Sequence, residues 1–161
     1  MGKTKKKRVL FICRHNSARS QMAEAFLREF YGNRYKVYNA GIEPIGINPY
    51  AIRIMKEIGI YISKQKSKSL NKFAGEEFDY VVTTCGDADE VCPVFPLGVE
   101  RIHNSFDDPT IAKGTEEEIL SEFRRVRDEI RKWVIETFGS HEECFRYSYS
   151  INYSGHCRTR R

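Results

Sequence analysis

Short apolar runs alternate with amphipathic segments along most of this chain. Runs rich in β-branched and aromatic residues at 9–12, 36–40, 78–84 and around 99–102 predict strands. Apolar positions at helical spacing predict helices over 18–30 and 49–59. Strands that alternate with helices indicate parallel β-α-β units. We therefore expect an α/β fold, with a doubly wound, four-stranded parallel sheet flanked by helices.

The last predicted helix has the clearest boundaries. Thr115 and Glu118 form a capping box at its start, and Gly139 ends it. Its apolar stripe consists of Ile119, Phe123, Val126, Ile130, Trp133, Val134 and Phe138. Residues 140–161 show no apolar period, so we expect a poorly ordered C-terminal tail there. The chain thus divides into a basic N-terminal arm (1–8), a single domain with the candidate chemistry (9–139) and the tail.

Composition and charge favour one globular domain. The chain has 161 residues, of which 40% are hydrophobic and 30% charged, an ordinary balance. No apolar stretch approaches the roughly 20 residues that cross a bilayer, and the first apolar run is too short for a signal peptide. We therefore expect a cytoplasmic protein without membrane contact. The net charge of +5 is concentrated in the two ends, so we expect solvated termini and no nucleic-acid partner. No dimer-forming stripe is visible beyond the core pattern, so we expect a monomer.

The candidate chemistry begins with Cys13, which ends the first predicted strand six positions before Arg19. The loop between them can wrap its backbone N–H groups around a tetrahedral anion, and the following helix adds its positive end. Arg19 can hold two anion oxygens, and the same field favours the thiolate of Cys13, a nucleophile. We assign oxyanion binding to the whole segment: Arg14, His15, Asn16, Ser17, Ala18, Arg19 and Ser20.

The residues of this loop favour the chemical interpretation over a structural one. A buried strand-end cysteine and an exposed helix arginine need no polar loop between them. Here Asn16 suits a left-handed turn, and the hydroxyls of Ser17 and Ser20 can bond the loop or the sulfur. His15 is either a site group or loop filler. Glycine is absent, so the loop is not of the glycine-rich nucleotide-binding type.

A second cluster contains Cys85 and Cys92, within the stretch TTCGDADEVCP. Cys85 ends a predicted strand, as Cys13 does, and the carboxyl ends of parallel strands form sites together, so we expect one shared site. The six residues between Cys85 and Cys92 suit zinc poorly, which leaves two inert cysteines or a redox pair. Cys144 and Cys157 lie in the tail, where irregular His and Cys spacing argues against a metal site.

A third candidate is Asp108, next to Asp107 and directly before Pro109. A residue before proline is biased toward extended geometry, so its side chain can be aimed from a loop. An ordinary turn is the alternative interpretation. General acid catalysis needs only one protonated carboxyl group beside a leaving oxygen, which favours the acid role.

These motifs resemble a known family. The segment CRHNSARSQMAE, from Cys13 to Glu24, resembles the phosphate-binding loop of the low-molecular-weight protein tyrosine phosphatase fold, which is flavodoxin-like. Its NSARSQMAE stretch is similar to the arsenate reductase branch, and the similarity runs over about residues 8–138. CGDAD before a second Cys-Pro resembles the thioredoxin-coupled arsenate reductases. The resemblance places the general acid at Asp108.

The resemblance implies reduction of arsenate to arsenite. Cys13 would attack arsenate held by the loop and Arg19, and Asp108 would protonate the departing oxygen. A Cys13–Cys85 disulfide would then give way to a Cys85–Cys92 disulfide, which thioredoxin reduces. No cofactor is required. Members of this branch can bind potassium near the loop, and Asn16 and Glu24 match two of the ligand positions, which leaves potassium binding open.

Two alternatives belong to other functional classes. A low-molecular-weight protein tyrosine phosphatase would use Cys13, Arg19 and Asp108 through a phosphocysteine. The Cys85 and Cys92 pair argues against it, as does Thr110, where such phosphatases carry a tyrosine. A non-catalytic anion- or nucleic-acid-binding module would use the basic ends and show strong, salt-sensitive binding.

Overall fold

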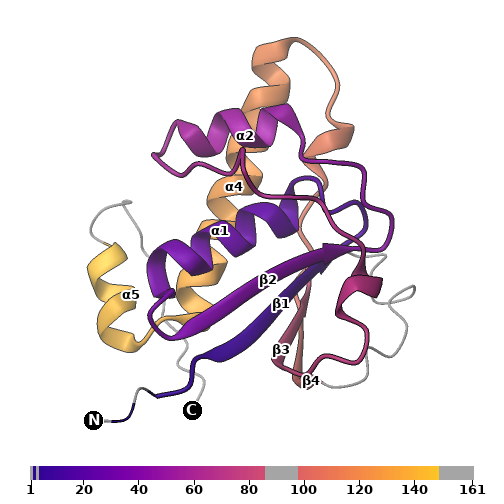
Figure 1. Cartoon of the computed structure of the whole chain (residues 1–161). Helices are drawn as coiled ribbons and strands as arrows, with labels where there is room; N and C mark the ends of the chain where they lie inside the picture. Colours follow the sequence, from indigo (N-terminus) through magenta and orange to yellow (C-terminus); the bar gives the residue numbers. More distant parts are fainter. Residues whose placement is uncertain (1, 3, 86–97, 149–161) are drawn as a thin grey trace.

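The computed structural model describes residues 2, 4–85 and 98–148. The elements in chain order are β1 (Lys7–Cys13), α1 (Arg19–Tyr31), β2 (Tyr35–Gly41), α2 (Pro49–Lys56), η1 (Leu70–Phe73), β3 (Phe78–Thr83), β4 (Gly98–His103), η2 (Pro109–Ile111), α4 (Glu116–Phe138) and α5 (His141–Ser148). The four strands are parallel, in the order β2-β1-β3-β4 (Figure 1). The predicted doubly wound parallel sheet is confirmed.

The winding of the sheet reverses at β1. From β1 the chain crosses through α1 to β2 on one side, and β3 pairs with the other side of β1. Ligands of doubly wound sheets bind at the carboxyl ends of the strands that flank such a switch point. Cys13 is the last residue of β1, and Cys85 follows shortly after β3. Both cysteines therefore lie at the place where this fold builds its sites.

Side chains of β1 alternate between two cores. Val9 and Phe11 face the larger core, which they form with α1, α2 and α4. Leu10 and Ile12 face a smaller core with η1 and β3. Figure 1 shows α1, α2, α4 and α5 together on the side of the larger core. Because β1 is buried on both faces, it reads as a continuous apolar run rather than an alternating one.

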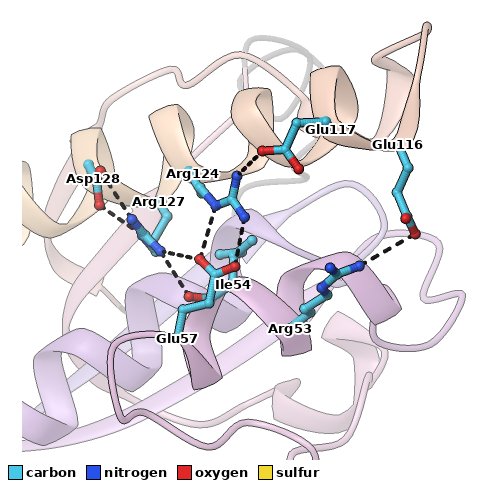
Figure 2. A network of polar contacts seen from close by, with 8 residues as sticks. All are labelled: Arg53, Ile54, Glu57, Glu116, Glu117, Arg124, Arg127 and Asp128. Carbon is cyan, nitrogen blue, oxygen red and sulfur yellow. Dashed lines mark hydrogen bonds and ion pairs between the residues drawn. The ribbon is translucent and has the colours of Figure 1, made fainter.

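Arg127 of α4 secures the end of α2 (Figure 2). Its buried Nη1 donates to the carbonyl oxygen of Ile54 at 2.9 Å and to Glu57 Oε2 at 3.3 Å. Arg124 holds Glu57 with two further hydrogen bonds of 3.0 and 2.9 Å. The last carbonyls of a helix lack partners within it, so Arg127 supplies a donor that α2 needs. Since residues 42–48 lead into α2, this contact also fixes the segment that borders the candidate site.

Helix α5 corrects the expectation of a poorly ordered tail over residues 141–148. The Glu143 N–H donates to Ser140 Oγ at 3.3 Å and the Ser140 N–H donates to Glu143 Oε2 at 2.9 Å, a capping box. Glu143 also pairs with Arg34 at 2.7 Å, and the rings of Tyr147 and Phe30 lie 4.8 Å apart. A helix this short is marginal alone, so docking against α1 and α4 stabilises it. In the sequence, the Ser-His-Glu-Glu stretch from Ser140 to Glu143 is the one feature that indicates this helix.

The other boundaries predicted from the sequence differ less from those in the structure. Lys7 and Arg8, which we place in the basic arm from sequence, are the first residues of β1. Cys144 belongs to α5 and is 1% exposed. The rest of the predicted tail, residues 149–161 with Cys157, lies outside the described residues. Within the part of the chain that the structure describes, no helix is long and apolar enough to cross a bilayer.

Candidate active site

The loop after Cys13 turns its carbonyl groups toward a neighbouring segment. Backbone N–H groups of residues 42–48 donate to the carbonyl oxygens of Cys13, Arg14, His15 and Ser17 over 2.8–3.4 Å. A trans peptide points its N–H away from its C=O, and none of the described peptide bonds is cis. The N–H groups that follow these carbonyls therefore point to the opposite side. Successive N–H groups arranged in this way form a nest that binds anions.

Helix α1 adds its N-terminus to this nest. Its N-cap is Ala18, whose side chain forms no capping hydrogen bond, so the N–H groups of the first turn stay available to an anion. Arg19 is 7% exposed and is held from the far side of the site. Its Nη1 donates to the carbonyl oxygen of Phe106 at 3.2 Å, and its Nη2 to Asp108 Oδ2 at 3.0 Å. A buried guanidinium beside an N–H nest suits a tetrahedral oxyanion.

Cys13 has a directed hydrogen bond to its sulfur. The side chain is 2% exposed, and Sγ lies 2.8 Å from Ser20 Oγ. Asn16 Oδ1 accepts from the backbone N–H of Lys68 at 2.8 Å, which fixes the amide so that Nδ2 donates to Ser20 Oγ at 2.9 Å. Ser20 Oγ thus accepts from Asn16 and also shares a hydrogen bond with the Cys13 sulfur, in which either atom can donate. This polar chain fixes the Ser20 hydroxyl beside the Cys13 sulfur.

Asn16 anchors the loop from behind. Its φ is 47°, the left-handed conformation that the sequence predicts, and its side chain is fully buried. Asn16 Nδ2 also donates to Asn39 Oδ1 at 2.9 Å. Gly41, at the end of β2, lies so close that a Cβ there would be 2.7 Å from Asn16 Cβ. Sequence reasoning missed Asn39 and Gly41, because no local spacing connects them with the loop.

Cys13 and Cys85 pack against each other, and neither forms a disulfide. Cys85 is 3% exposed. Thr84 holds it in place, since its N–H and its Oγ1 both donate to the carbonyl oxygen of Ile12, at 2.9 and 3.1 Å. The structure therefore brings together the two cysteines that the sequence predicts at neighbouring strand ends. Cys92, the third predicted thiol, lies outside the described residues.

Asp108 lies beside the guanidinium of Arg19, whereas Asp107 does not. The chain after β4 is tied to the end of β3 by two backbone hydrogen bonds of 3.0 and 3.1 Å, which carry the following residues to the site. Asp108 Oδ1 accepts from the N–H and the Oγ1 of Thr110, at 3.0 and 2.7 Å. Asp107 instead pairs with Arg125 at 2.9 Å on the exposed side of α4. Of the two carboxylates, only Asp108 lies in contact with the guanidinium that faces the nest.

The side chains of Arg14 and His15 lie at the rim of the loop. Arg14 Nε is 3.5 Å from Glu43 Oε2, and His15 Nε2 is 4.0 Å from the same oxygen. All three side chains are partly exposed, so these contacts contribute little to stability. The two residues offer the nest their backbone groups. Ser17 and Ala18, by contrast, are buried within the loop.

Lys68 occupies the polar cluster that the sequence leaves open for potassium. Its Nζ donates to Asn39 Oδ1 at 2.7 Å and to a backbone carbonyl oxygen at 2.9 Å. Burial lowers the pKa of Lys68, and the charge of Glu24 opposes this shift. Burial likewise raises the pKa of Glu24, which nearby cationic side chains oppose. A fixed ammonium group beside Asn16 and Glu24 repels a second cation, so these residues do not fit a potassium ion.

This fold and this site define a class of enzyme in which a strand-end cysteine acts on a tetrahedral oxyanion. The family model described as low molecular weight phosphotyrosine protein phosphatase matches residues 8–143. The arsenate reductase of Halalkalibacterium halodurans is 51% identical over 129 residues, covering 80% of this chain and 93% of that one. The chain belongs to the low molecular weight phosphotyrosine protein phosphatase family and, within it, to the arsenate reductases.

Solved structures agree with this assignment. An arsenate reductase in the phosphate binding state has a TM-score of 0.69 and 32% identity, covering 80% of this chain and 93% of that one. A thioredoxin-dependent arsenate reductase from Corynebacterium glutamicum has a TM-score of 0.58 and 32% identity, covering 81% of this chain and 63% of the other. Both similarities extend over most of this chain.

Proposed function

We propose that this enzyme reduces arsenate to arsenite through a relay of three cysteines that thioredoxin regenerates. The observation that carries the proposal is the contact between two buried cysteines without a disulfide, Cys13 and Cys85, beside an anion nest. A phosphatase of this fold needs only the first of them. The relatives support the same chemistry, since they are arsenate reductases and one of them is thioredoxin-dependent.

In the first step, the Cys13 thiolate attacks arsenic in an arsenate held by the loop N–H groups and Arg19. The As–O bond breaks as Asp108 protonates the departing oxygen, which leaves as water. The product is a Cys13–arsenic(V) adduct. Arsenate enters because it has the shape and charge of phosphate, for which such nests are suited.

In the second step, the Cys85 thiolate attacks the sulfur of Cys13. The S–As electron pair leaves with arsenic, which is reduced to arsenite, and a Cys13–Cys85 disulfide forms. Cys92 then attacks Cys85, freeing Cys13 as a thiolate, and the Cys85–Cys92 disulfide is reduced by the dithiol of thioredoxin. A cycle that starts from free thiols fits a reducing compartment, so we place the enzyme in the cytoplasm.

Arsenite release measured with thioredoxin, thioredoxin reductase and NADPH tests the relay. We expect many turnovers from the wild type and about one arsenite per enzyme from Cys92→Ser, because only the final exchange is lost. Cys13→Ser and Cys85→Ser should release none. Cys157→Ser, a cysteine outside the relay, serves as the control and should turn over like the wild type.

One outcome would replace the proposal with phosphatase chemistry. It is a wild type that releases no arsenite but hydrolyses a phenyl phosphate, with Cys92→Ser hydrolysing it equally well. In that case the nest, Arg19 and Asp108 would act through a phosphocysteine, and the second and third thiols would have no part in turnover.

A further inference from the structure

Gln21 of α1 is a fully buried amide that is hydrogen-bonded through both its nitrogen and its oxygen. Its Nε2 donates to the carbonyl oxygen of Asn16 at 3.0 Å, to Asn16 Oδ1 at 3.1 Å and to the carbonyl oxygen of Lys66 at 3.3 Å. Its Oε1 accepts from Asn39 Nδ2 at 3.1 Å and from Gln65 Nε2 at 2.7 Å. Burying an amide is costly unless it is hydrogen-bonded, and here the bonds connect α1 with the loop that forms the nest.

We propose that Gln21 is a positioning residue for oxyanion binding, which turns the peptide bond between Asn16 and Ser17 so that the Ser17 N–H points into the nest. This inference rests on the proposed function and deepens it, because it assigns the residue that sets one of the donors to the substrate anion. Gln21 acts only through this peptide bond and does not touch the anion.

The carbonyl group of Asn16 has a different partner from the other carbonyl groups of the loop. Backbone N–H groups of residues 42–48 bond the other four carbonyls between positions 13 and 17. The carbonyl oxygen of Asn16 accepts instead from Gln21 Nε2. In a trans peptide the N–H points away from the C=O, so each contact fixes the direction of the N–H that follows. Residues 42–48 therefore orient the other N–H groups of the loop, and Gln21 orients that of Ser17.

Gln21 bonds the loop from the same outer side as the segment that follows β2. The carbonyl oxygen of His15 accepts both from the Ile45 N–H at 3.2 Å and from Ser67 Oγ at 3.4 Å. Lys66, whose carbonyl oxygen accepts from Gln21 Nε2, is next to Ser67 in the chain. The carbonyl groups of the loop therefore all face outward, and the N–H groups that follow them face the inside of the nest.

Lys68 fixes which way the Gln21 amide is turned. Its ammonium group can only donate, so Asn39 Oδ1, which lies 2.7 Å from Nζ, is an acceptor. Asn39 Nδ2 is then the donor to Gln21 Oε1, which leaves Gln21 Nε2 for the Asn16 carbonyl oxygen. One end of this chain of bonds is an ammonium group and the other is a carbonyl oxygen, so only one direction satisfies every group.

The same contact holds Asn16 in a strained conformation. Its φ of 47° lies in the left-handed region, which residues other than glycine adopt only at a cost. Gln21 Nε2 bonds both the carbonyl oxygen and the side-chain oxygen of Asn16, so it fixes the backbone and the side chain together. Without this contact the peptide bond between Asn16 and Ser17 can rotate, and the Ser17 N–H leaves the nest. The other N–H groups keep their direction, because residues 42–48 hold them.

Amide proton shifts on sulfate binding test this role directly. Sulfate is a tetrahedral dianion that does not titrate near neutral pH, and an N–H that donates to it moves downfield in the NMR spectrum. In the isotope-labelled, reduced wild type, we expect the Ser17 amide proton to move downfield together with those of Arg14 and His15. In Gln21→Met, which nearly keeps the volume but has no donor, the Ser17 shift should be lost while the other two remain.

The affinity for sulfate gives the magnitude of the effect. Calorimetric titration should show about tenfold weaker binding in Gln21→Met, because one hydrogen bond to a charged group is lost. Val134→Ala is the control, since it destabilises the fold through a cavity in the larger core. We expect this control to keep the Ser17 shift and to bind sulfate within twofold of the wild type.

Three results would overturn the role of Gln21. One is a Ser17 amide proton that stays in place in the wild type while those of Arg14 and His15 move. Another is a Gln21→Met variant that keeps both the Ser17 shift and the wild-type affinity. The third is an equal loss of shift at all three amides in Gln21→Met, since Gln21 would then hold the whole loop rather than one peptide bond.

The wild type alone provides a further measurement that does not require the variant to fold. A scalar coupling across the hydrogen bond between Gln21 Nε2 and the Asn16 carbonyl carbon should be present with sulfate bound, and its absence would overturn the proposal. These measurements do not depend on arsenate reduction. An enzyme that releases arsenite but lacks the Ser17 shift refutes the role of Gln21 alone. A protein that shows the shift but releases no arsenite refutes the proposed function alone.

Discussion

Replacing Gly41 with alanine tests how closely β2 approaches the phosphate-binding loop. The added Cβ would lie 2.7 Å from Asn16 Cβ, 2.8 Å from Asn16 N and 3.0 Å from the carbonyl oxygen of Arg14. Two of these three atoms belong to the backbone of the loop, so they cannot move aside as the end of a flexible side chain can. The loop must therefore shift by several tenths of an ångström.

The shift has two measurable consequences. Overpacking of this kind costs about 1–3 kcal/mol of unfolding free energy, measured by urea denaturation. The displaced backbone is the one that positions the N–H donors around the oxyanion. A misplacement of about 1 Å costs about 100-fold in rate, so we expect a shift of several tenths of an ångström to lower kcat/KM for arsenate about tenfold.

Gly59→Ala is the matched control. Gly59 follows α2 with a φ of 78° and has nothing within 4 Å of an added Cβ. Alanine there costs about 1–2 kcal/mol in stability through backbone strain alone, with no effect on the loop. We expect kcat/KM to stay within twofold of the wild type. If Gly41→Ala also kept kcat/KM within twofold, the nest would not depend on this contact and the account of the site would be wrong.

Three further predictions concern the cation site and the α2–α4 contact. Replacing NaCl with KCl at constant ionic strength should change the KM for arsenate less than twofold, because Lys68 already supplies the cation. A several-fold activation by potassium in steady-state kinetics would contradict this prediction. Arg127→Met should lower the unfolding free energy, measured in urea, by about 2–3 kcal/mol, because it leaves the buried carbonyl of Ile54 without a donor. Arg53→Met, at an exposed position, is the control. An equal loss of unfolding free energy in the control would argue against a specific role of Arg127. The hydrogen bond from Arg124 lowers the pKa of Glu57 below its ordinary value of 4.5. The ionised Glu57 therefore stabilises the folded protein above pH 4.5, and this contribution is lost as the pH falls through the lowered pKa. Glu57→Gln should therefore flatten the decline of unfolding free energy below pH 4.5, by a small amount because Glu57 is exposed.

Sequence reasoning succeeded where the chemistry is local in the chain. The buried strand β1, the spacing from Cys13 to Arg19 and the left-handed Asn16 all depend on residues within a few positions of one another. A strand-loop-helix unit fixes such groups on a common scaffold, so its spacing alone predicts an anion nest. The capping box at Thr115 and the end of α4 at Gly139 were predictable for the same reason.

The tertiary structure decided what lies around the nest. Lys68 and Asn16 are 52 positions apart in the chain, and Asp108 and Arg19 are 89 apart. No local pattern shows that the Lys68 ammonium group lies beside Asn39 or that Asp108 pairs with Arg19. Such contacts depend on how the segments after β2 and β4 pack against the carboxyl edge of the sheet. Spacing along a strand or helix therefore determined where Cys13 and its loop lie, and packing between distant segments determined which charged side chains surround them.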